Sequence, residues 1–350
     1  TRTKRGWMMA TEKTNRQKQH LIILTLGVTL IAAFVVSICV GRYSVSPFEA
    51  VEIIIRSIFG ETVDIDPFKL SVIINVRLPR IIMAIIIGAG LSLAGTAYQG
   101  IFGNPLVSPD MLGVSSSAGF GAALGILIGM GGVLTQGLSL AFGLLSVLIV
   151  LVFSRVRKKT QLFTLVLSGV IVRSLFDAFV SLIKYVADPQ DKLPAIVVWL
   201  MGSLASSSYK DVVISALVIL PCIVLLIILR WQMNLLSLDE EEARSLGVNV
   251  GSLRKLIIAV STLITAVSVS TCGIIGWVGL VIPHVGRLLV GNDHRVLIPA
   301  SALIGAIYLL FVDGIARTMT AAEIPLSILT AIIGAPFFAY MLRKTAGGIT

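Results

Sequence analysis

Long apolar runs recur along almost the whole chain, and they constrain its fold more than any other feature. A bilayer core requires about 20 apolar residues per helix. Runs of roughly that length occur at residues 21–41, 78–98, 112–131, 134–153, 163–186, 212–230, 256–272, 297–316 and 325–342. A tenth run, at 277–290, is shorter and contains Pro283, but neighbouring helices can shield its ends. The sequence therefore predicts an all-α polytopic membrane protein with ten transmembrane helices.

The composition agrees with a membrane protein and argues against a nucleic-acid partner. The chain is 56% hydrophobic and 13% charged, whereas soluble domains are roughly 25% charged. The net charge of +10 comes from basic residues that cluster between apolar runs, which membrane topology explains. The three cysteines are widely spaced inside apolar runs and predict packing residues rather than disulfides or metal ligands. We expect the lipid bilayer as a partner and no nucleic acid.

The distribution of Lys and Arg orients the bundle. With the N-terminus inside, the inner segments hold 18 of the 28 basic residues and the outer segments hold 9, with Arg173 inside a span. This bias predicts an N-in, C-in topology. Residues 1–20 are then a cytoplasmic tail without a signal-peptide cleavage site, 21–344 a single transmembrane domain, and 345–350 a C-terminal tail. Residues 47–59 are amphipathic at helical spacing and predict an interfacial helix.

One acidic segment stands out between two apolar runs. It is SLDEEEARSLGVNV, at residues 237–250. Ser237 and Glu240 form a capping-box pattern, the acids lie in the first turn, and Gly247 is a helix stop. We expect a cytoplasmic helix of about nine residues, roughly 14 Å long. An ordinary capped loop helix and a handle for a soluble partner remain equally good interpretations.

Motifs for nucleotide or metal chemistry are missing from the sequence. It contains no G-x-x-x-x-G-K-[ST] motif, so we expect any ATP and Mg²⁺ on a partner subunit and no cofactor in this chain. His20, His284 and His294 lack ligand-like spacing, and no metal site is predicted. We expect His284 and His294 to form hydrogen bonds near the inner face.

Charged residues inside or beside the spans carry the remaining functional hypotheses. Arg173 and Asp177 are spaced i, i+4, as are Asp313 and Arg317, which favours self-pairing on one helix face over an ion relay. Nothing else charged is expected deep in the bundle, which argues against an ion channel or a proton-coupled carrier and favours a passage for something bulky. Arg77 and Arg80, with Arg317, predict a positive outer rim for an acidic partner. Glycine and small residues at 88, 92 and 95 predict close helix contacts.

Several motifs together resemble those of the FecCD-type permeases. They are VRLPR (76–80), QGIFGNPLVSPDMLGVSSSAG (99–119), ARSLGV (243–248), GWVGLVIPH (276–284) with Arg287, DHR (293–295), EIP (323–325) and GAP (334–336). The resemblance covers residues 20–350. These permeases are membrane subunits of type II ABC importers for vitamin B12, haem and ferric siderophores. The resemblance implies a ten-helix subunit like the vitamin B12 permease. Two such subunits would form a homodimer, with two cytoplasmic ATPase subunits and an external substrate-binding protein.

The resemblance also implies roles for particular residues. The coupling helix, at 238–247, would use Asp239, Glu240, Glu241, Glu242, Arg244, Leu246 and Gly247 to contact the ATPase. Binding-protein docking would use Arg77, Arg80 and Arg317. The cytoplasmic gates would be Asn104 with Leu106, and Leu162 with Phe163, where the vitamin B12 relative instead carries small hydroxyl residues. The second gate is therefore expected to be more hydrophobic.

The predicted function is the permease subunit of an ATP-driven importer in the inner membrane of a bacterium. A ferric siderophore or haem is the expected cargo, with cobalamin or another metal complex as a further option. The alternatives are an ion-gradient-driven carrier or exporter of a bulky lipophilic solute, and a membrane subunit without transport. The carrier or exporter would not need an acidic helix or an outer arginine rim, and a subunit without transport would show no ATP-dependent accumulation.

Overall fold

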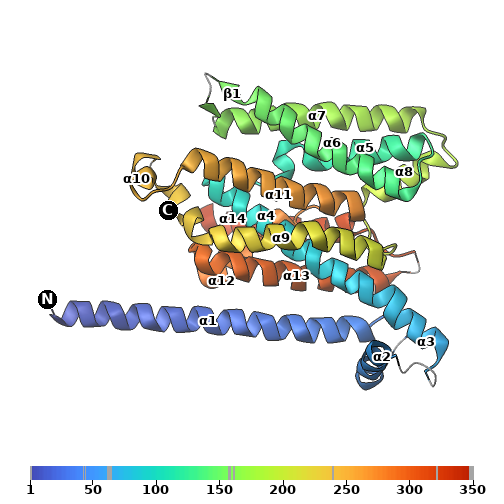
Figure 1. Cartoon of the computed structure of the whole chain (residues 1–350), viewed down its shortest axis with the longest axis horizontal. Coiled ribbons are helices and arrows are strands. Elements are labelled where there is room, and N and C mark those ends of the chain that lie inside the picture. Colours follow the sequence, from blue (N-terminus) through green and yellow to red (C-terminus); the bar gives the residue numbers. More distant parts are fainter. Residues whose placement is uncertain are drawn as a thin grey trace.

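Long helices run side by side along the molecule and form one bundle (Figure 1). The computed structural model describes residues 2–346 except 42, 44, 61–64, 157–158, 161, 239 and 321. In the first half of the chain the elements are α1 (Arg2–Cys39), α2 (Pro47–Phe59), α3 (Pro67–Ser71), the π-helix η1 (Val72–Arg77), α4 (Leu78–Phe102), the 3-10 helix η2 (Pro109–Leu112), α5 (Val114–Leu127) and α6 (Gly132–Phe153). In the second half they are β1 (Arg155–Val156), β2 (Lys159–Thr160), α7 (Leu162–Val186), α8 (Lys192–Leu200), α9 (Tyr209–Asn234), η3 (Leu235–Ser237), α10 (Glu240–Ser245), α11 (Val250–Cys272), α12 (Val278–Val290), α13 (His294–Met319) and α14 (Leu326–Ala346).

Each predicted apolar run lies largely within a helix. In the described part of the chain, seven helices are long and apolar enough to cross a bilayer, and α5, α12 and residues 326–341 of α14 are shorter apolar helices. The chain is therefore a multi-pass helical membrane protein, while ten crossings and the N-in, C-in orientation stay predictions. The all-α expectation needs one correction, because β1 and β2 form a short antiparallel hairpin between α6 and α7.

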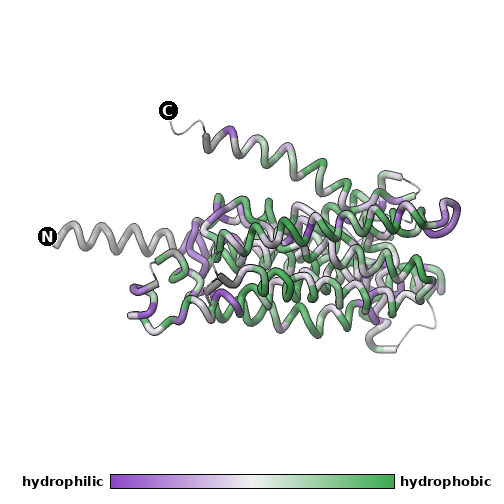
Figure 2. Tube along the Cα trace, turned by 90° about the horizontal axis from the view of Figure 1, so that it is seen from above, coloured by the Kyte–Doolittle hydropathy of each residue, from purple (hydrophilic) through white to green (hydrophobic). Residues whose placement is uncertain are grey.

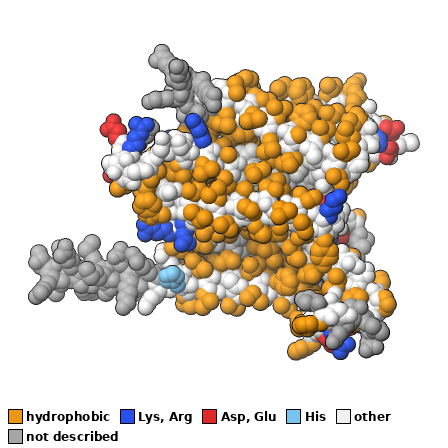
Figure 3. Space-filling view, in the orientation of Figure 1, with side chains coloured by type: hydrophobic (Ala, Val, Ile, Leu, Met, Phe, Trp, Pro, Cys, Tyr) orange, Lys and Arg blue, Asp and Glu red, His pale blue; other side chains and the backbone are white. Residues whose placement is uncertain are grey.

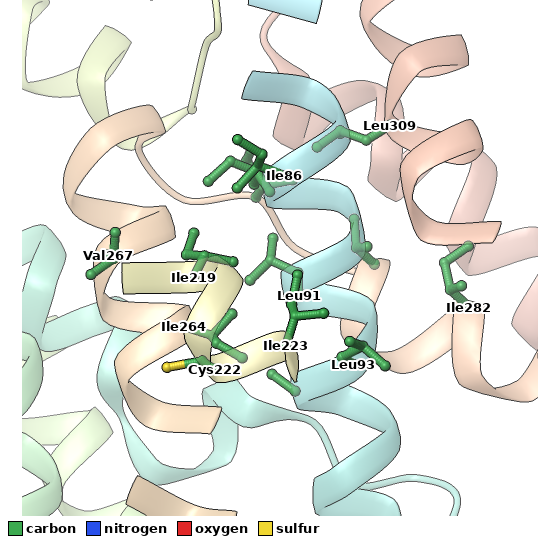
Figure 4. Packing of buried hydrophobic residues seen from close by; sticks show 14 of the residues in the cluster. Ile86, Leu91, Leu93, Ile219, Cys222, Ile223, Ile264, Val267, Ile282 and Leu309 are labelled. Carbon is green, nitrogen blue, oxygen red and sulfur yellow. The ribbon is translucent and has the colours of Figure 1, made fainter. Parts of the chain in front are cut away.

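Helix α4 occupies the centre of the bundle. It is apolar around its whole circumference and most of its residues are buried, as expected of a helix enclosed by others. Figure 4 shows Ile86, Leu91 and Leu93 of α4 among apolar side chains from α9, α11, α12 and α13. The helices around α4 therefore share one continuous core.

Small residues let two helices approach α4 closely. A Cβ on Gly88 would overlap the backbone of Gly305 in α13, and a Cβ on Gly95 would overlap that of Gly279 in α12. Between these points the Ser92 hydroxyl donates a hydrogen bond to the Ser301 carbonyl at 2.7 Å. The close contacts predicted from small residues at helical spacing are confirmed.

The two ends of the bundle differ in their elements, and we name each after a helix. The α2 end holds α2, α3 and the segment between α13 and α14, and the α10 end holds α10 and the hairpin (Figure 1). Helix α1 begins and α14 finishes towards the α10 end. Hydrophilic residues concentrate at the ends with apolar residues between them (Figure 2), and most charged side chains on the face in Figure 3 also lie near the ends.

Helix α2 has the bounds predicted from its amphipathic pattern. The Ser46 hydroxyl accepts a hydrogen bond from the Glu49 amide at 3.2 Å and caps its start, and Gly60 ends it in the left-handed region at φ 76°. Its inner face buries Ile53, while Phe48 is 89% exposed. This distribution agrees with an interfacial helix, although that location stays a prediction.

Candidate functional site

Five charged side chains meet inside the α2 end. We call Arg77, Arg80, Asp313, Arg317 and Glu323 the charged cluster. Arg80 Nε lies 2.8 and 3.1 Å from the two Asp313 carboxylate oxygens, and its Nη1 lies 3.1 and 2.9 Å from those of Glu323. Arg317 Nε lies 3.2 Å from Asp313 Oδ2. One fully buried carboxylate is therefore shared by arginines from two helices, and a second carboxylate supports one of them.

Two arginines of the charged cluster also bind the last turn of α1. Arg77 donates to the Ile38 carbonyl at 2.6 Å, to the Cys39 carbonyl at 3.3 Å and to the Tyr43 carbonyl. Arg317 donates to the carbonyl and the hydroxyl of Ser37 at 3.0 and 2.9 Å. The last carbonyls of a helix have no partners within the helix, and cations are favoured beside them. The cluster therefore ties the end of α1 to η1 and α13.

The predicted outer rim takes a different form in the structure. Arg77, Arg80 and Arg317 do gather at one end, but they are only 5%, 4% and 6% exposed. Because a buried charge is stable only when it is paired, their side chains turn inward to carboxylates and carbonyls. The expectation of an exposed positive rim is wrong for this chain, and docking of a binding protein on these residues stays a prediction. The pairing of Asp313 with Arg317 is confirmed.

The acidic segment forms the short helix α10. It spans six residues rather than about nine, because η3 includes Ser237 and moves the helix start away from it. The side chain of Ser237 and residue Asp239 lie outside the described residues, so the Ser237 cap stays a prediction. Gly247 ends the helix as predicted, at φ 81°, with its amide donating to the Arg244 carbonyl at 2.9 Å.

Helix α10 is anchored on one side and exposed on the other. Ala243 is fully buried, whereas Glu241, Glu242, Arg244 and Leu246 are exposed. Asp239 and the side chain of Glu240 lie outside the described residues. The exposed face carries two acids, a base and a leucine that is 53% exposed, which suits contact with another protein.

The predicted gate residues occupy two separate segments. Asn104 Oδ1 accepts a hydrogen bond from the Leu106 amide at 2.9 Å, which closes a tight turn after α4, and Leu106 is 45% exposed. Leu162 and Phe163 begin α7 after the hairpin, and Phe163 is 78% exposed. Exposed apolar side chains in both segments leave room for a partner surface, while the gate assignment stays a prediction.

The charged pair on α7 is confirmed but lies on an open surface. Arg173 Nε is 3.6 Å from Asp177 Oδ2, and each side chain is 55% exposed. The pair lies near the middle of α7, among apolar side chains such as Ile171 and Leu175 that are also exposed. An isolated chain therefore exposes charge near the middle of a helix that is long and apolar enough to cross a bilayer.

The sequence alone does not reveal that Glu323 is a partner of Arg80. Glu323 lies in the EIP motif quoted above, but the two residues are 243 positions apart. The only local sign is a carboxylate close to the end of the span that carries Asp313 and Arg317. This position alone does not identify the arginine that Glu323 contacts.

The fold defines a multi-pass helical membrane protein, and the comparisons with known proteins name its family. A family model described as the FecCD transport family matches residues 29–344. The chain belongs to this family of transport permeases.

Relatives across bacteria share most of its length. The molybdate import system permease MolB of Haemophilus influenzae is 44% identical over 329 residues, covering 93% of this chain and 96% of that protein. A probable iron chelatin transport permease of Helicobacter pylori is 44% identical over 278 residues, covering 79% and 83%. A solved structure described as an inward-facing putative metal-chelate type ABC transporter has 43% identity and a TM-score of 0.83, and covers 92% of this chain and 99% of its own.

Proposed function

We propose that the chain is the permease subunit of an ATP-driven importer, which moves a metal chelate from an external binding protein to the cytoplasm. The proposed location is the inner membrane of a bacterium, and the first expected cargo is a ferric siderophore or haem, with cobalamin as a further option. Membership of the FecCD family supports the importer, and the iron chelatin and metal-chelate relatives support the cargo class.

Helix α10 is the observation that carries the proposed link to ATP. It is short, anchored by Ala243, and exposes Glu241, Glu242 and Arg244 to a soluble partner. The excess of basic residues in the segments at this end supports a cytoplasmic location. A cytoplasmic ATPase that binds this face could transmit its own closure through α10 to α9 and α11, the helices on either side of it.

The proposed mechanism is alternating access. ATP binding would draw two ATPase subunits together and shift the helices, so that a central path opens to one face and then to the other. The nucleotide moves this equilibrium only because it binds one state more tightly than the other. Substrate selection would depend mainly on the external binding protein.

The exposed pair on α7 supports a second copy of the chain around that path. A charged side chain facing lipid at the centre of a bilayer is costly, so such residues face a partner or water. Arg173 and Asp177 are 55% exposed within a 25-residue span. Helix α14 also diverges from the bundle, with Ile332 and Tyr340 64% and 63% exposed (Figure 2). A homodimer would cover these surfaces or place them along an aqueous path.

Molybdate is a second candidate cargo. The relative from Haemophilus influenzae is named for molybdate import, and the match extends over almost the full length of both chains. An iron chelate and an oxyanion differ greatly in size, so a direct comparison of uptake separates them.

The test is uptake into vesicles that contain the permease, its ATPase and its binding protein. Labelled ferric siderophore, haem, cobalamin and molybdate are supplied outside, with and without ATP. We expect ATP-dependent accumulation of one of them. Accumulation driven by an ion gradient without the ATPase would contradict the proposal, as would no accumulation of any of the four.

A charge-inverted α10 tests the coupling step. Glu241→Lys with Glu242→Lys is expected to abolish both ATPase co-purification and uptake, because the substituted residues would repel a complementary basic surface. Glu52→Lys on α2, at the opposite end, is the control and is expected to preserve both. Intact assembly and uptake in the α10 variant would rule out this role.

A further inference from the structure

A cavity of about 530 Å³, lined by both polar and apolar residues, opens at the α10 end. It lies between the end of α4, helix α12 and the start of α13. Its polar lining is formed by Gln99, Asn104, His284, Arg287, Asn292 and His294. None of these residues is a carboxylate, and one of them, Asn104, is a predicted gate residue.

Arg287 is held in the cavity wall by an uncharged partner. Its side chain is half-buried and donates to Gln99 Oε1, an uncharged acceptor. The Gln99 Nε2 donates to the Leu280 carbonyl at 3.3 Å, which fixes the amide with its oxygen towards the arginine. Among the described residues, no carboxylate forms an ion pair with Arg287. The positive charge is therefore held in the cavity wall without a matching negative charge.

The two histidines add polar groups to the same wall. His284 Nδ1 is enclosed and has no hydrogen-bond partner in the described chain. The expectation that His284 forms hydrogen bonds is therefore not met at this nitrogen. His294 Nδ1 lies 2.9 Å from Asn234 Oδ1, which also accepts from the His294 amide. The hydrogen bond expected of His294 is thus confirmed.

The carboxylate next to His294 in the sequence does not neutralise the cavity. Asp293 accepts hydrogen bonds from the Asn234 side chain at 2.7 Å and from the Arg295 amide at 2.9 Å. It caps α13 and does not line the cavity. Among the described residues, Arg287 is therefore left without a carboxylate partner.

We propose that this cavity binds a small oxygen-bearing anion of the phosphate, sulfate or molybdate type, held mainly by Arg287. The guanidinium presents several N–H donors in a plane that matches two oxygens of such an anion. The Asn104 amide nitrogen can donate as well, because its oxygen is already bonded to the Leu106 amide. The cavity is ample, since a water molecule takes about 30 Å³. The site needs no ATPase or binding protein, so it is independent of the proposed importer function.

Binding is tested on the full-length chain purified in detergent. Thermal unfolding is measured against increasing phosphate, sulfate or molybdate, with chloride at matched ionic strength as the reference. A ligand that binds only the folded protein raises Tm as its concentration rises. We expect a saturable rise in Tm with at least one oxyanion. Tighter binding of phosphate would indicate an anion of the cytoplasm, and tighter binding of molybdate would indicate an anionic cargo.

Variants show whether the binding uses this cavity. Arg287→Gln is expected to weaken the apparent affinity about tenfold or more, as for loss of a charged hydrogen bond. Arg295→Gln removes an exposed arginine at the same end, outside the cavity lining, and is expected to leave the affinity unchanged. Arg287→Lys keeps the charge and is expected to bind weakly but saturably. It provides a second readout if Arg287→Gln does not fold.

Three outcomes would contradict the proposed anion site. The first is a wild-type protein that responds to no oxyanion beyond the chloride reference. The second is Arg287→Gln binding as tightly as wild type, and the third is Arg295→Gln losing as much affinity as Arg287→Gln. Each can occur while ATP-driven uptake persists, so failure of the site is distinguishable from failure of the proposed function.

Discussion

The arginines at the two ends of the bundle differ in their burial and in their partners. In the charged cluster at the α2 end, Arg80 meets both Asp313 and Glu323, and Arg317 shares Asp313. In the cavity at the α10 end, Arg287 meets only the amide oxygen of Gln99. The arginines at the α2 end are enclosed and paired with carboxylates or with backbone carbonyls, whereas Arg287 leaves positive charge beside an open volume. An arginine that borders a cavity without a carboxylate is therefore the better candidate for binding a ligand.

The largest effect is expected when the shared carboxylate of the charged cluster is removed. Asp313→Asn would leave Arg80 and Arg317 buried with their charge only partly compensated, at a cost of about 3–5 kcal/mol in the free energy of unfolding. Denaturant unfolding in detergent measures this cost. The control is Glu52→Gln, which breaks the exposed ion pair with Arg56 on α2 and is expected to cost less than about 1 kcal/mol. Equal costs for the two variants would show that burial of the cluster does not matter.

A matched substitution at both ends tests the comparison directly. Arg80→Met would leave Glu323 unpaired and Asp313 with a single arginine, so we expect a loss of about 3–5 kcal/mol. Arg287→Met removes a charge that has no carboxylate, so without added oxyanion its cost should stay below about 1.5 kcal/mol, the value of one ordinary hydrogen bond. If the two variants unfold at the same denaturant concentration, the distinction between the ends is wrong.

A smaller loss in the free energy of unfolding is expected at the edge of the charged cluster. Glu323 is 29% exposed, and Arg80 keeps its bonds to Asp313 when Glu323→Gln is made. Hydrogen bonds to charged groups contribute about 1.5–3 kcal/mol to the free energy of unfolding. Because solvent reaches the Glu323 side chain, we expect a cost no larger than this. The same unfolding measurement checks it. A cost as large as that of Asp313→Asn would mean that Glu323 shares the central role.

The smallest effect concerns Asp293, the carboxylate beside the α10 cavity. Burial alone would raise its pKa, but hydrogen bonds from the Arg295 amide and the Asn234 side chain lower the pKa below its usual value. A lowered pKa in the folded state contributes stability above the unfolded-state pKa, roughly 3.9, which is lost as the pH falls through the folded-state pKa. Asp293→Asn keeps a capping side chain without this titration.

The measurement is the stability difference between wild type and Asp293→Asn across pH. We expect a constant difference near neutral pH that shrinks in the acid range. A stability difference that grows on acidification would contradict a lowered pKa for Asp293.

Local patterns predicted the elements well, because each depends on neighbours in the sequence. The bounds of α2 follow from its apolar spacing and its Ser46 and Gly60 caps, and Gly247 ends α10 since it readily adopts a positive φ. The pairs one helical turn apart, Arg173 with Asp177 and Asp313 with Arg317, also form as expected. The predicted start of α10 was too early, because Ser237 belongs to η3 and α10 begins at Glu240.

The direction of the arginines could not be predicted in this way. Arg77 and Arg80 lie at the end of a span, where the same residues could equally reach outward to a partner or inward to the protein. Their acceptors are 34 to 39 residues away for Arg77 and 233 and 243 residues away for Arg80. Arg287 and Gln99 are likewise 188 residues apart. No periodicity within a helix encodes such distances.

The sequence by itself determined that this chain is a bundle of membrane helices with an acidic segment beside it, and its motifs identified the permease family. Only the tertiary structure decided which charges are neutralised inside the bundle and which remain available to a ligand. The physical reason is that hydrophobic length and helix capping act over a few residues, whereas the pairing of buried charges depends on which helices the fold brings together.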